Sequence, residues 1–298
     1  MSDENTINME ITEISRRTSE TQRFIRVFFN RGLVIFGMVI LLALIIIAIT
    51  APLISPYDPY QPDLTSTLAK PSHTHWLGTD ALGRDSLSRI LYGSQTSMMI
   101  CLLVVAFASI FGTGLGLLAG YFGGWTYTII MRCMDALMAF PMILLALVIA
   151  ALLGGGTKNV IIALSVAMLP GYARLMCGQV LSVKENDYVL AGHAIGARNM
   201  RIMLRHVTPN CFPPLIVAMT MQLGGVILAE AGLSFLGIGI EAPTAAWGSM
   251  INDGRQYLLS HPVLSFAPGA VIMLVVFGFN MVGDGLRDAL DPRLRGVL

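Results

Sequence analysis

Long apolar runs alternate with shorter polar, basic or glycine-rich segments along the whole chain. Six runs read as helices, at about residues 33–54, 95–118, 137–153, 159–182, 210–235 and 263–283. A helix rises about 1.5 Å per residue, so about 20 residues cross a hydrocarbon core of about 30 Å. Hydrocarbon offers no partner to the backbone of an open strand, so every span must be helical. The pattern predicts an all-α integral membrane protein with six transmembrane helices.

The composition supports a membrane protein and excludes an ordinary soluble domain. Charged residues make up 12% of the chain, against roughly 25% in soluble proteins. The mean hydropathy is +0.70. The first apolar run is longer than the core of a cleavable signal peptide, which has roughly 7–15 residues. We therefore expect it to remain as an anchor.

Lysine and arginine are sorted between the two sides of the predicted membrane. If the N-terminus is cytosolic, 14 of the 19 basic residues lie in cytosolic segments, so the positive-inside rule places both termini in the cytosol. A net charge of +1 sorted in this way gives no nucleic-acid surface. The predicted regions are a cytosolic tail 1–32, a first helix 33–54, an extracytoplasmic segment 55–94, a five-helix domain 95–284 with a cytosolic loop 183–209, and a cytosolic tail 285–298. Within the second outer segment, GIEAPTAAWGSM reads as turns.

The loop between the fourth and fifth runs, YVLAGHAIGARNMRIMLRHVTPN at 188–210, is basic and contains a mid-segment glycine. Residues 187–195 predict a short helix, Gly196 permits a sharp turn, and a second helix over 199–207 is expected to end before Pro209. The face predicted to be exposed on the first helix carries Leu190, Ala191, Ala194 and Ile195. The arginines predicted on one face of the second are Arg198, Arg201 and Arg205, suited to phosphate headgroups or an acidic partner. Such a helix fits a protein groove, and a helix lying on the membrane surface is the alternative.

Few other residues suggest chemistry. Glu230 lies near the outer end of the fifth run, where an ionisable residue usually faces protein or a wet cavity, so packing and pathway roles are both open. Gly114, Gly116 and Gly120 predict close helix packing. His73 and His75 lack a third ligand, and we expect a solvated loop pair and no metal site. The chain also contains no GxSxG or HExxH pattern, which predicts a protein without catalytic residues.

The basic loop resembles the EAA loop of permease subunits in bacterial binding-protein-dependent ABC importers. The matching positions are Leu190, Ala191, Gly192, Gly196 and Pro209. Leu190 replaces the usual Glu and Gly192 the usual Ala. Three further stretches, HWLGTDALGRDSLSRILYGSQTS at 75–97, GIEAPTAAWGSMINDGR at 239–255 and FNMVGDGLRDALDPRLRG at 279–296, look like the dipeptide, oligopeptide and nickel group of these permeases.

The resemblance implies a type I ABC importer permease fold and a multi-pass location in the bacterial inner membrane. It implies a second homologous permease, two cytosolic ATPases that hold ATP and Mg, an extracytoplasmic solute-binding protein and surrounding lipid as partners. This chain would bind no cofactor and move peptides or related solutes by alternating access, with the basic loop as its coupling helix. An ion-coupled secondary transporter without ATPases is the alternative, although only Glu230 hints at it. A membrane scaffold without transport ranks last.

Overall fold

The computed structural model describes residues 20–290, and within that range the fold is helical, with one isolated bridge between Thr79 and Asp85. The elements in chain order are α2 (Glu20–Phe29), α3 (Gly32–Ile54), α4 (Ser86–Phe122), α5 (Gly124–Met138), α6 (Met142–Leu153), α7 (Thr157–Lys184), α8 (Asp187–Ala194), α9 (Asn199–Ile202), the π-helix η1 (Met203–Val207), α10 (Thr208–Phe235), α11 (Trp247–Gly254), the 3₁₀ helix η2 (Arg255–Tyr257) and α12 (Val263–Leu290). The predicted tails 1–32 and 285–298 lie partly outside the described residues.

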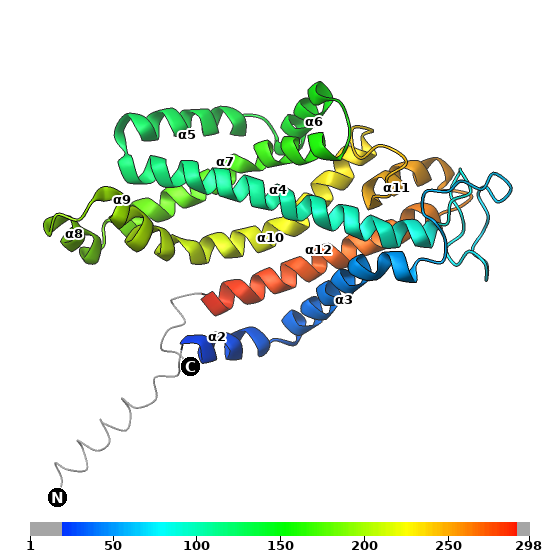
Figure 1. Ribbon diagram of the computed structural model, residues 1–298, viewed down its shortest axis with the longest axis horizontal. Coiled ribbons are helices and arrows are strands. Elements are labelled where there is room, and N and C mark those ends of the chain that lie inside the picture. Colours follow the sequence, from blue (N-terminus) through cyan, green and yellow to red (C-terminus); the bar gives the residue numbers. More distant parts are fainter. Residues whose placement is uncertain (1–19, 291–298) are drawn as a thin grey trace, which may run out of the picture.

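The long helices run side by side along the longest axis of the molecule, and the connecting segments gather at its two ends (Figure 1). We call the end formed by residues 55–85 and 236–262 the cap end. Residues 185–207, which contain α8 and α9, form the knob at the opposite end. Arg31 pairs with Asp288 at 2.6 Å, so the segment between α2 and α3 and the end of α12 lie together on the knob side (Figure 1).

Five described helices are long and apolar enough to cross a membrane, and a bent pair, α5 with α6, makes a sixth span when taken together. The prediction of one helix over 137–153 was wrong, because α5 and α6 meet at 90°. Pro141 explains the break: it precedes α6 in an extended conformation, and proline disfavours helical backbone in the residue before it.

The second span begins at Ser86, earlier than residue 95 where the apolar run starts. Asp85 is its N-cap, and its Oδ2 accepts a hydrogen bond of 2.8 Å from the Ser88 N–H. A capping carboxylate satisfies one of the free N–H groups of a helix start. The helix therefore includes a polar first turn that hydropathy alone does not reveal.

Glycines allow α4 and α7 to pack closely. Gly112, Gly116 and Gly120 lie one turn apart on α4, and a Cβ at any of them would crowd the backbone carbonyls of α7. Gly114, which was predicted at such a contact, has no neighbour within 4 Å of a Cβ position. It lies two residues from Gly112 and therefore on another side of the helix. Small residues at helix crossings are typical of membrane bundles.

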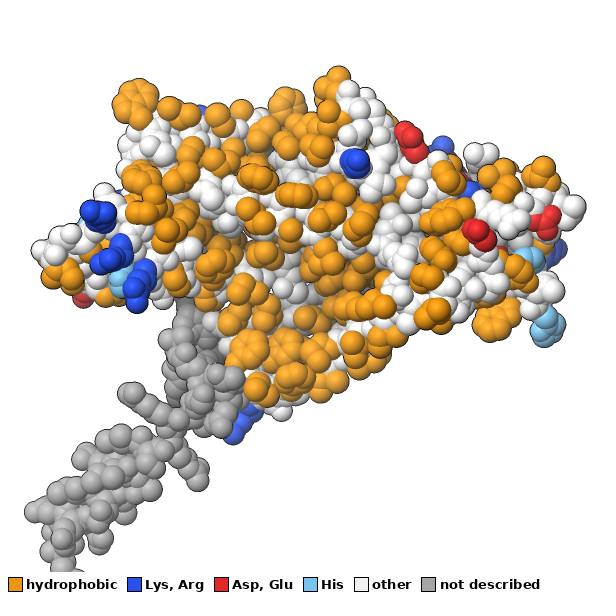
Figure 2. Space-filling model, viewed as in Figure 1, with side chains coloured by type: hydrophobic (Ala, Val, Ile, Leu, Met, Phe, Trp, Pro, Cys, Tyr) orange, Lys and Arg blue, Asp and Glu red, His pale blue; other side chains and the backbone are white. Residues whose placement is uncertain are grey.

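Apolar side chains cover the long helices, and charged side chains gather at the two ends (Figure 2). Leu53 is 86% exposed and Leu152 is 83% exposed. A soluble protein rarely exposes apolar patches of this extent. The surface along the bundle is therefore suited to lipid and to other membrane helices.

Candidate functional site: the knob and the cap

The knob begins with α8, which confirms the predicted short helix over 187–195. Gly196 follows with φ of +77°, which glycine adopts without strain. Its N–H donates to the His193 carbonyl, and the Ala197 N–H donates to the Gly192 carbonyl at 3.1 Å. This pair of bonds is the Schellman arrangement that ends helices at a left-handed glycine. The sharp turn predicted at Gly196 is therefore confirmed.

Opposite sides of α8 have different roles. Val189 is buried and belongs to a cluster with Ile202, Met203 and Val207, which fixes α8 to the start of the next helix. The predicted exposed residues Leu190, Ala191, Ala194 and Ile195 are all exposed. Ile195 is 85% exposed and Leu190 56%, so the knob presents bulky apolar side chains that nothing in the described chain covers.

Gly192 and Leu190 depart from the EAA pattern of the resembled permeases, and neither departure is required by the packing of the knob. A Cβ at Gly192 would lie 3.6 Å from Ile202, an ordinary contact, so glycine is not required there by space. Leu190 points its side chain outward instead of into the fold. Leucine in place of glutamate at position 190 therefore changes the exposed surface of the knob and leaves its packing unchanged.

The second helix of the loop does not end before Pro209, so that prediction was wrong. α9 passes into η1 and then into α10, without a break up to Phe235. The Thr208 N–H donates to the Met203 carbonyl, five residues back. This π-helical turn comes just before Pro209. Pro209 lies in the first turn of α10, and the first turn of a helix tolerates a residue without an N–H. The knob is consequently continuous with a membrane span.

Three arginines make the knob end basic. Arg198, Arg201 and Arg205 are exposed, and lysine and arginine side chains cluster beside α8 and α9 in Figure 2. None of the three makes an ion pair with a carboxylate of residues 20–290. Their charges are therefore available to a partner or to lipid phosphates.

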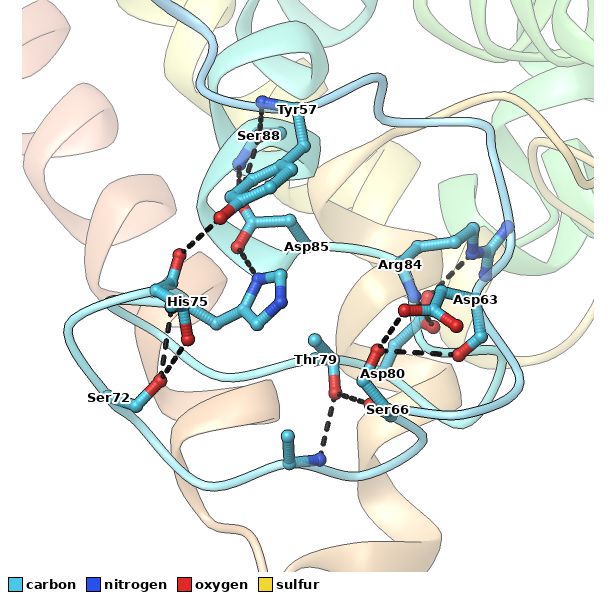
Figure 3. A network of polar contacts seen from close by, with 12 residues as sticks. Tyr57, Asp63, Ser66, Ser72, His75, Thr79, Asp80, Arg84, Asp85 and Ser88 are labelled. Carbon is cyan, nitrogen blue, oxygen red and sulfur yellow. Dashed lines mark hydrogen bonds and ion pairs between the residues drawn. The ribbon is translucent and has the colours of Figure 1, made fainter.

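The cap end is organised by Asp85 (Figure 3). Its Oδ1 lies 2.9 Å from Nδ1 of His75, and its Oδ2 accepts a hydrogen bond of 2.7 Å from the Ser88 hydroxyl. The expectation that His73 and His75 form a solvated pair was wrong for His75, which is bound to this carboxylate. Within the described residues, no group of three or more potential metal ligands occurs.

A buried arginine ties the two cap segments together. Arg89, 2% exposed, donates to the Pro59 carbonyl at 3.1 Å and the Pro243 carbonyl at 3.4 Å, and lies 3.6 Å from Asp80. The Asp80 carboxylate is also paired with Arg84 at 2.7 Å. Buried charges require such partners because desolvation is costly. The cap segments are therefore fixed to α4.

The second cap segment contains a helix where turns were predicted. The turn interpretation of GIEAPTAAWGSM fails from Trp247 onward, since α11 begins there. The buried Trp247 donates from Nε1 to the Ile90 carbonyl at 3.1 Å and lies against Gly93. A large aromatic side chain with its N–H satisfied is a strong anchor, and it holds α11 on α4.

Glu230 lies under α11 and is 1% exposed. Its Oε1 accepts a hydrogen bond of 2.8 Å from Ser234 one turn later. A Cβ at Gly248 of α11 would lie 3.2 Å from the same oxygen. Sequence reasoning found the carboxylate but missed Gly248, because the two residues lie on separate elements brought together only by the fold.

The long apolar helices, the broken third span and the protruding basic knob together define a helical membrane protein. The model of the family described as the binding-protein-dependent transport system inner membrane component matches residues 112–296. The model of the N-terminal TM domain of oligopeptide transport permease C matches residues 19–71. The chain belongs to the family of binding-protein-dependent transport system inner membrane components. It is a permease subunit of an ATP-driven ABC importer of the inner membrane.

Relatives support this over nearly the whole chain. Identity is 44% to the dipeptide transport system permease protein DppC of Alkalihalophilus pseudofirmus, over 88% of this chain and 86% of the relative. It is 41% to the probable D,D-dipeptide transport system permease protein DdpC of Escherichia coli, over 89% of each. It is 40% to the glutathione transport system permease protein GsiD of Pectobacterium atrosepticum, over 92% and 91%.

A solved structure supports the fold. An inward-facing conformation of the MetNI methionine ABC transporter matches with a TM-score of 0.58 and 18% identity, over 69% of this chain and 97% of that chain. This confirms the predicted type I importer permease fold. A permease of this class works with ATPase and permease partners. The alternative of an ion-coupled carrier is therefore not supported.

Proposed function

We propose that this chain forms half of the pathway of an importer for dipeptides, oligopeptides or chemically related solutes. A second homologous permease forms the other half, two ATPases bind at the knob end, and a solute-binding protein delivers solute at the cap end. The names of the relatives support this solute class, since they concern dipeptides, D,D-dipeptides and glutathione. All three are small molecules with peptide bonds, a free amino group and a free carboxyl group.

The knob end and both termini face the cytosol in this proposal, and the cap faces the outside. The distribution of basic residues supports this orientation, because cytosolic loops of membrane proteins carry an excess of lysine and arginine. Arg198, Arg201 and Arg205 are in the knob, and Arg31 and Arg287 lie near the same end.

The knob is the coupling element. Its proposed contact residues are Leu190, Ala191, Gly192, Ala194, Ile195, Gly196, Arg198, Arg201 and Arg205, together with Pro209 just after the knob. The observation that carries this proposal is the continuity of the knob with a span: α9, η1 and α10 form one uninterrupted helical segment. A displacement of the knob by a partner therefore moves α10 as well.

The partner ATPases supply the energy and hold ATP and Mg, and this chain supplies no catalytic residue. ATP binding draws the ATPases together, the docked knobs follow, and the helices change between inward and outward openings. Coupling requires that ATP and loaded binding protein favour the same conformation of the permease pair. The role of this chain is thus mechanical.

The test uses the complete transporter in proteoliposomes. Replacing Ala191 with Glu and Gly196 with Arg should abolish ATP-driven dipeptide uptake while the protein still assembles in the membrane, because the exposed contact face is altered without touching the buried core. Gly123→Arg is the matched control, since Gly123 also has positive φ and open space around it but lies outside the knob. Undiminished uptake in vesicles without the ATPases would disprove the proposal.

A further inference from the structure

A cavity of about 620 Å³ lies between α7, α10 and α12 on the knob side of the bundle. Its apolar walls include Val217, Ala218 and Met221, and its lining also includes Pro209, Asn210, Pro213, Pro214, Gln179 and Arg287. It is therefore an apolar chamber with a few polar groups, which is the usual composition of small-molecule sites.

Two prolines remove the usual helical donors of two backbone carbonyls in residues that line this cavity. In an α-helix the carbonyl of Asn210 accepts from the N–H of residue 214, or in a tighter turn from residue 213. Both positions are proline, which has no N–H. Pro213 also removes the ordinary α-helical donor to the Pro209 carbonyl. The residues of the cavity wall thus include two carbonyls, of Pro209 and Asn210, whose usual helical donors are replaced by prolines.

Two side chains complete the polar lining. The Gln179 amide and the Arg287 guanidinium form no side-chain hydrogen bond or ion pair with another residue of the range 20–290. Arg287 is exposed and Gln179 is half-buried. Within membrane proteins, backbone acceptors without helical partners are tolerated where they line a cavity that holds water or solute.

We propose that this cavity is a site where the transported solute rests on its way to the cytosol, an inference that rests on the function proposed above. The ligand is a short zwitterionic peptide. Its ammonium group is held by the carbonyls of Pro209 and Asn210 and the amide oxygen of Gln179, and its carboxylate by Arg287. The apolar walls take its small side chains.

The polar lining favours a polar solute over other occupants. An apolar helix of the second permease, or a lipid chain, would offer no donor to the Asn210 carbonyl and no acceptor to the Arg287 guanidinium. A polar group without a hydrogen-bond partner is unfavourable where water is excluded, and more so when it is charged. A zwitterionic peptide satisfies both.

The experiment measures protection of a cysteine in the cavity wall. Ala218→Cys is introduced into a Cys133→Ser background, which removes the exposed native thiol and leaves the three buried ones. The complete transporter in inside-out vesicles is labelled with a charged thiol reagent, with and without the dipeptide Ala-Ala. The background without the new cysteine gives the baseline. We expect Ala-Ala to slow labelling several-fold, and N-acetyl-Ala-Ala amide, which lacks both charges, to have little effect.

Further substitutions test whether the protection by Ala-Ala depends on the Asn210 carbonyl and on Arg287. Pro214→Ala restores an N–H for the Asn210 carbonyl and should reduce protection. Pro170→Ala is the matched control, because Pro170 is also inside a membrane helix but outside the cavity. Arg287→Gln should reduce protection by Ala-Ala, and Arg287→Lys should retain part of it.

Three results would overturn the inference while leaving the proposed function intact, provided that the same vesicles still take up dipeptide with ATP. These are equal labelling with and without Ala-Ala, protection that Pro214→Ala and Arg287→Gln do not change, and a cysteine that no reagent reaches because a partner helix fills the cavity. ATP-independent uptake would instead disprove the proposed function itself.

Discussion

Gly83 at the cap end and Gly196 at the knob end have almost the same backbone, with φ of +76° and +77°. A Cβ at Gly83 would overlap the carbonyl of Asp63, whereas a Cβ at Gly196 would have no neighbour within 4 Å. Both positions favour glycine for conformational reasons. At Gly83, glycine is required also because a neighbouring segment packs against it. The cap segment is therefore closely packed around Gly83, whereas the space around Gly196 in the knob is unfilled.

The side chains of the two ends differ in the same way in their burial and in their partners. At the cap, Asp85 is buried and bonded to His75 and Ser88 (Figure 3). Arg89 is also buried, and it bonds to the carbonyls of Pro59 and Pro243 in the two cap segments. At the knob, Ile195 and the three arginines are exposed and have no partner within the described chain. The cap therefore contributes stability to the subunit, whereas the knob leaves the exposed surface that the proposed contact with an ATPase requires.

The largest effect is expected at Arg89. Arg89→Ala removes a buried charge that holds Pro59, Pro243 and Asp80, and breaking a buried pair in this way costs about 3–5 kcal/mol. The measurement is thermal unfolding of the purified subunit complex in detergent, with the amount of protein in the membrane as a second reading. Lys70→Ala, at an exposed cap residue, should change neither. An unchanged unfolding temperature for Arg89→Ala would mean that the cap is not a stabilising unit.

Gly83→Ala should have the next largest effect. Positive φ costs a non-glycine residue about 1–2 kcal/mol, and the overlap with Asp63 adds a packing cost of about 1–3 kcal/mol. Thermal unfolding should show a clear loss of stability, and the variant at Gly196 described next serves as its control because the backbone is the same. Equal losses at the two glycines would contradict the contrast between a closed cap and an open knob.

Gly196→Ala should lower stability less and coupling more. The strain of about 1–2 kcal/mol is relieved by a small rotation of α8, because the space around it is open. Such a rotation misplaces Leu190 and Ile195 relative to the partner surface. The ratio of dipeptide uptake to ATP hydrolysis in proteoliposomes should fall while the unfolding temperature changes little. A variant with full coupling would show that the angle of α8 is not important.

Properties that depend on neighbouring residues in the chain could be predicted from the sequence. The apolar runs gave most of the spans, and the helix at 187–195 with its turn at Gly196 followed from local composition. The errors concern properties that hydropathy does not record. The first turn of α4 is polar and capped by Asp85, and Pro141 divides the third span into two helices at 90°.

Contacts between distant segments could not be predicted from one sequence. Arg89 bridges to Pro243, and Glu230 lies beside Gly248, although nothing in the local pattern relates the members of either pair. The choice between Gly112 and Gly114 depends on which side of α4 faces α7, and two residues change that side. The cavity beside α10 could be found only from the positions of three helices, although the Pro213–Pro214 pair is visible in the sequence.

The smallest effect is expected from pH at Asp63 of the cap. Hydrogen bonds, first from the Ser66 hydroxyl at 2.6 Å and then from Thr65, lower the pKa of Asp63 from 3.8 to about 2. A lowered pKa in the folded state means that this carboxylate stabilises the cap fully above about pH 3.8, and that its contribution is lost as pH falls through about 2. Ser66→Ala should raise the pKa toward 3.8, so that the loss begins at higher pH. A carboxyl carbon NMR titration of aspartate-labelled protein, with Asp63→Asn to assign the signal, measures this shift. Ser72→Ala is the control, because Ser72 bonds to His75 and Thr74 and not to Asp63. If Asp63 of the native protein titrates near 3.8, the hydrogen bonds of this turn do not stabilise its carboxylate.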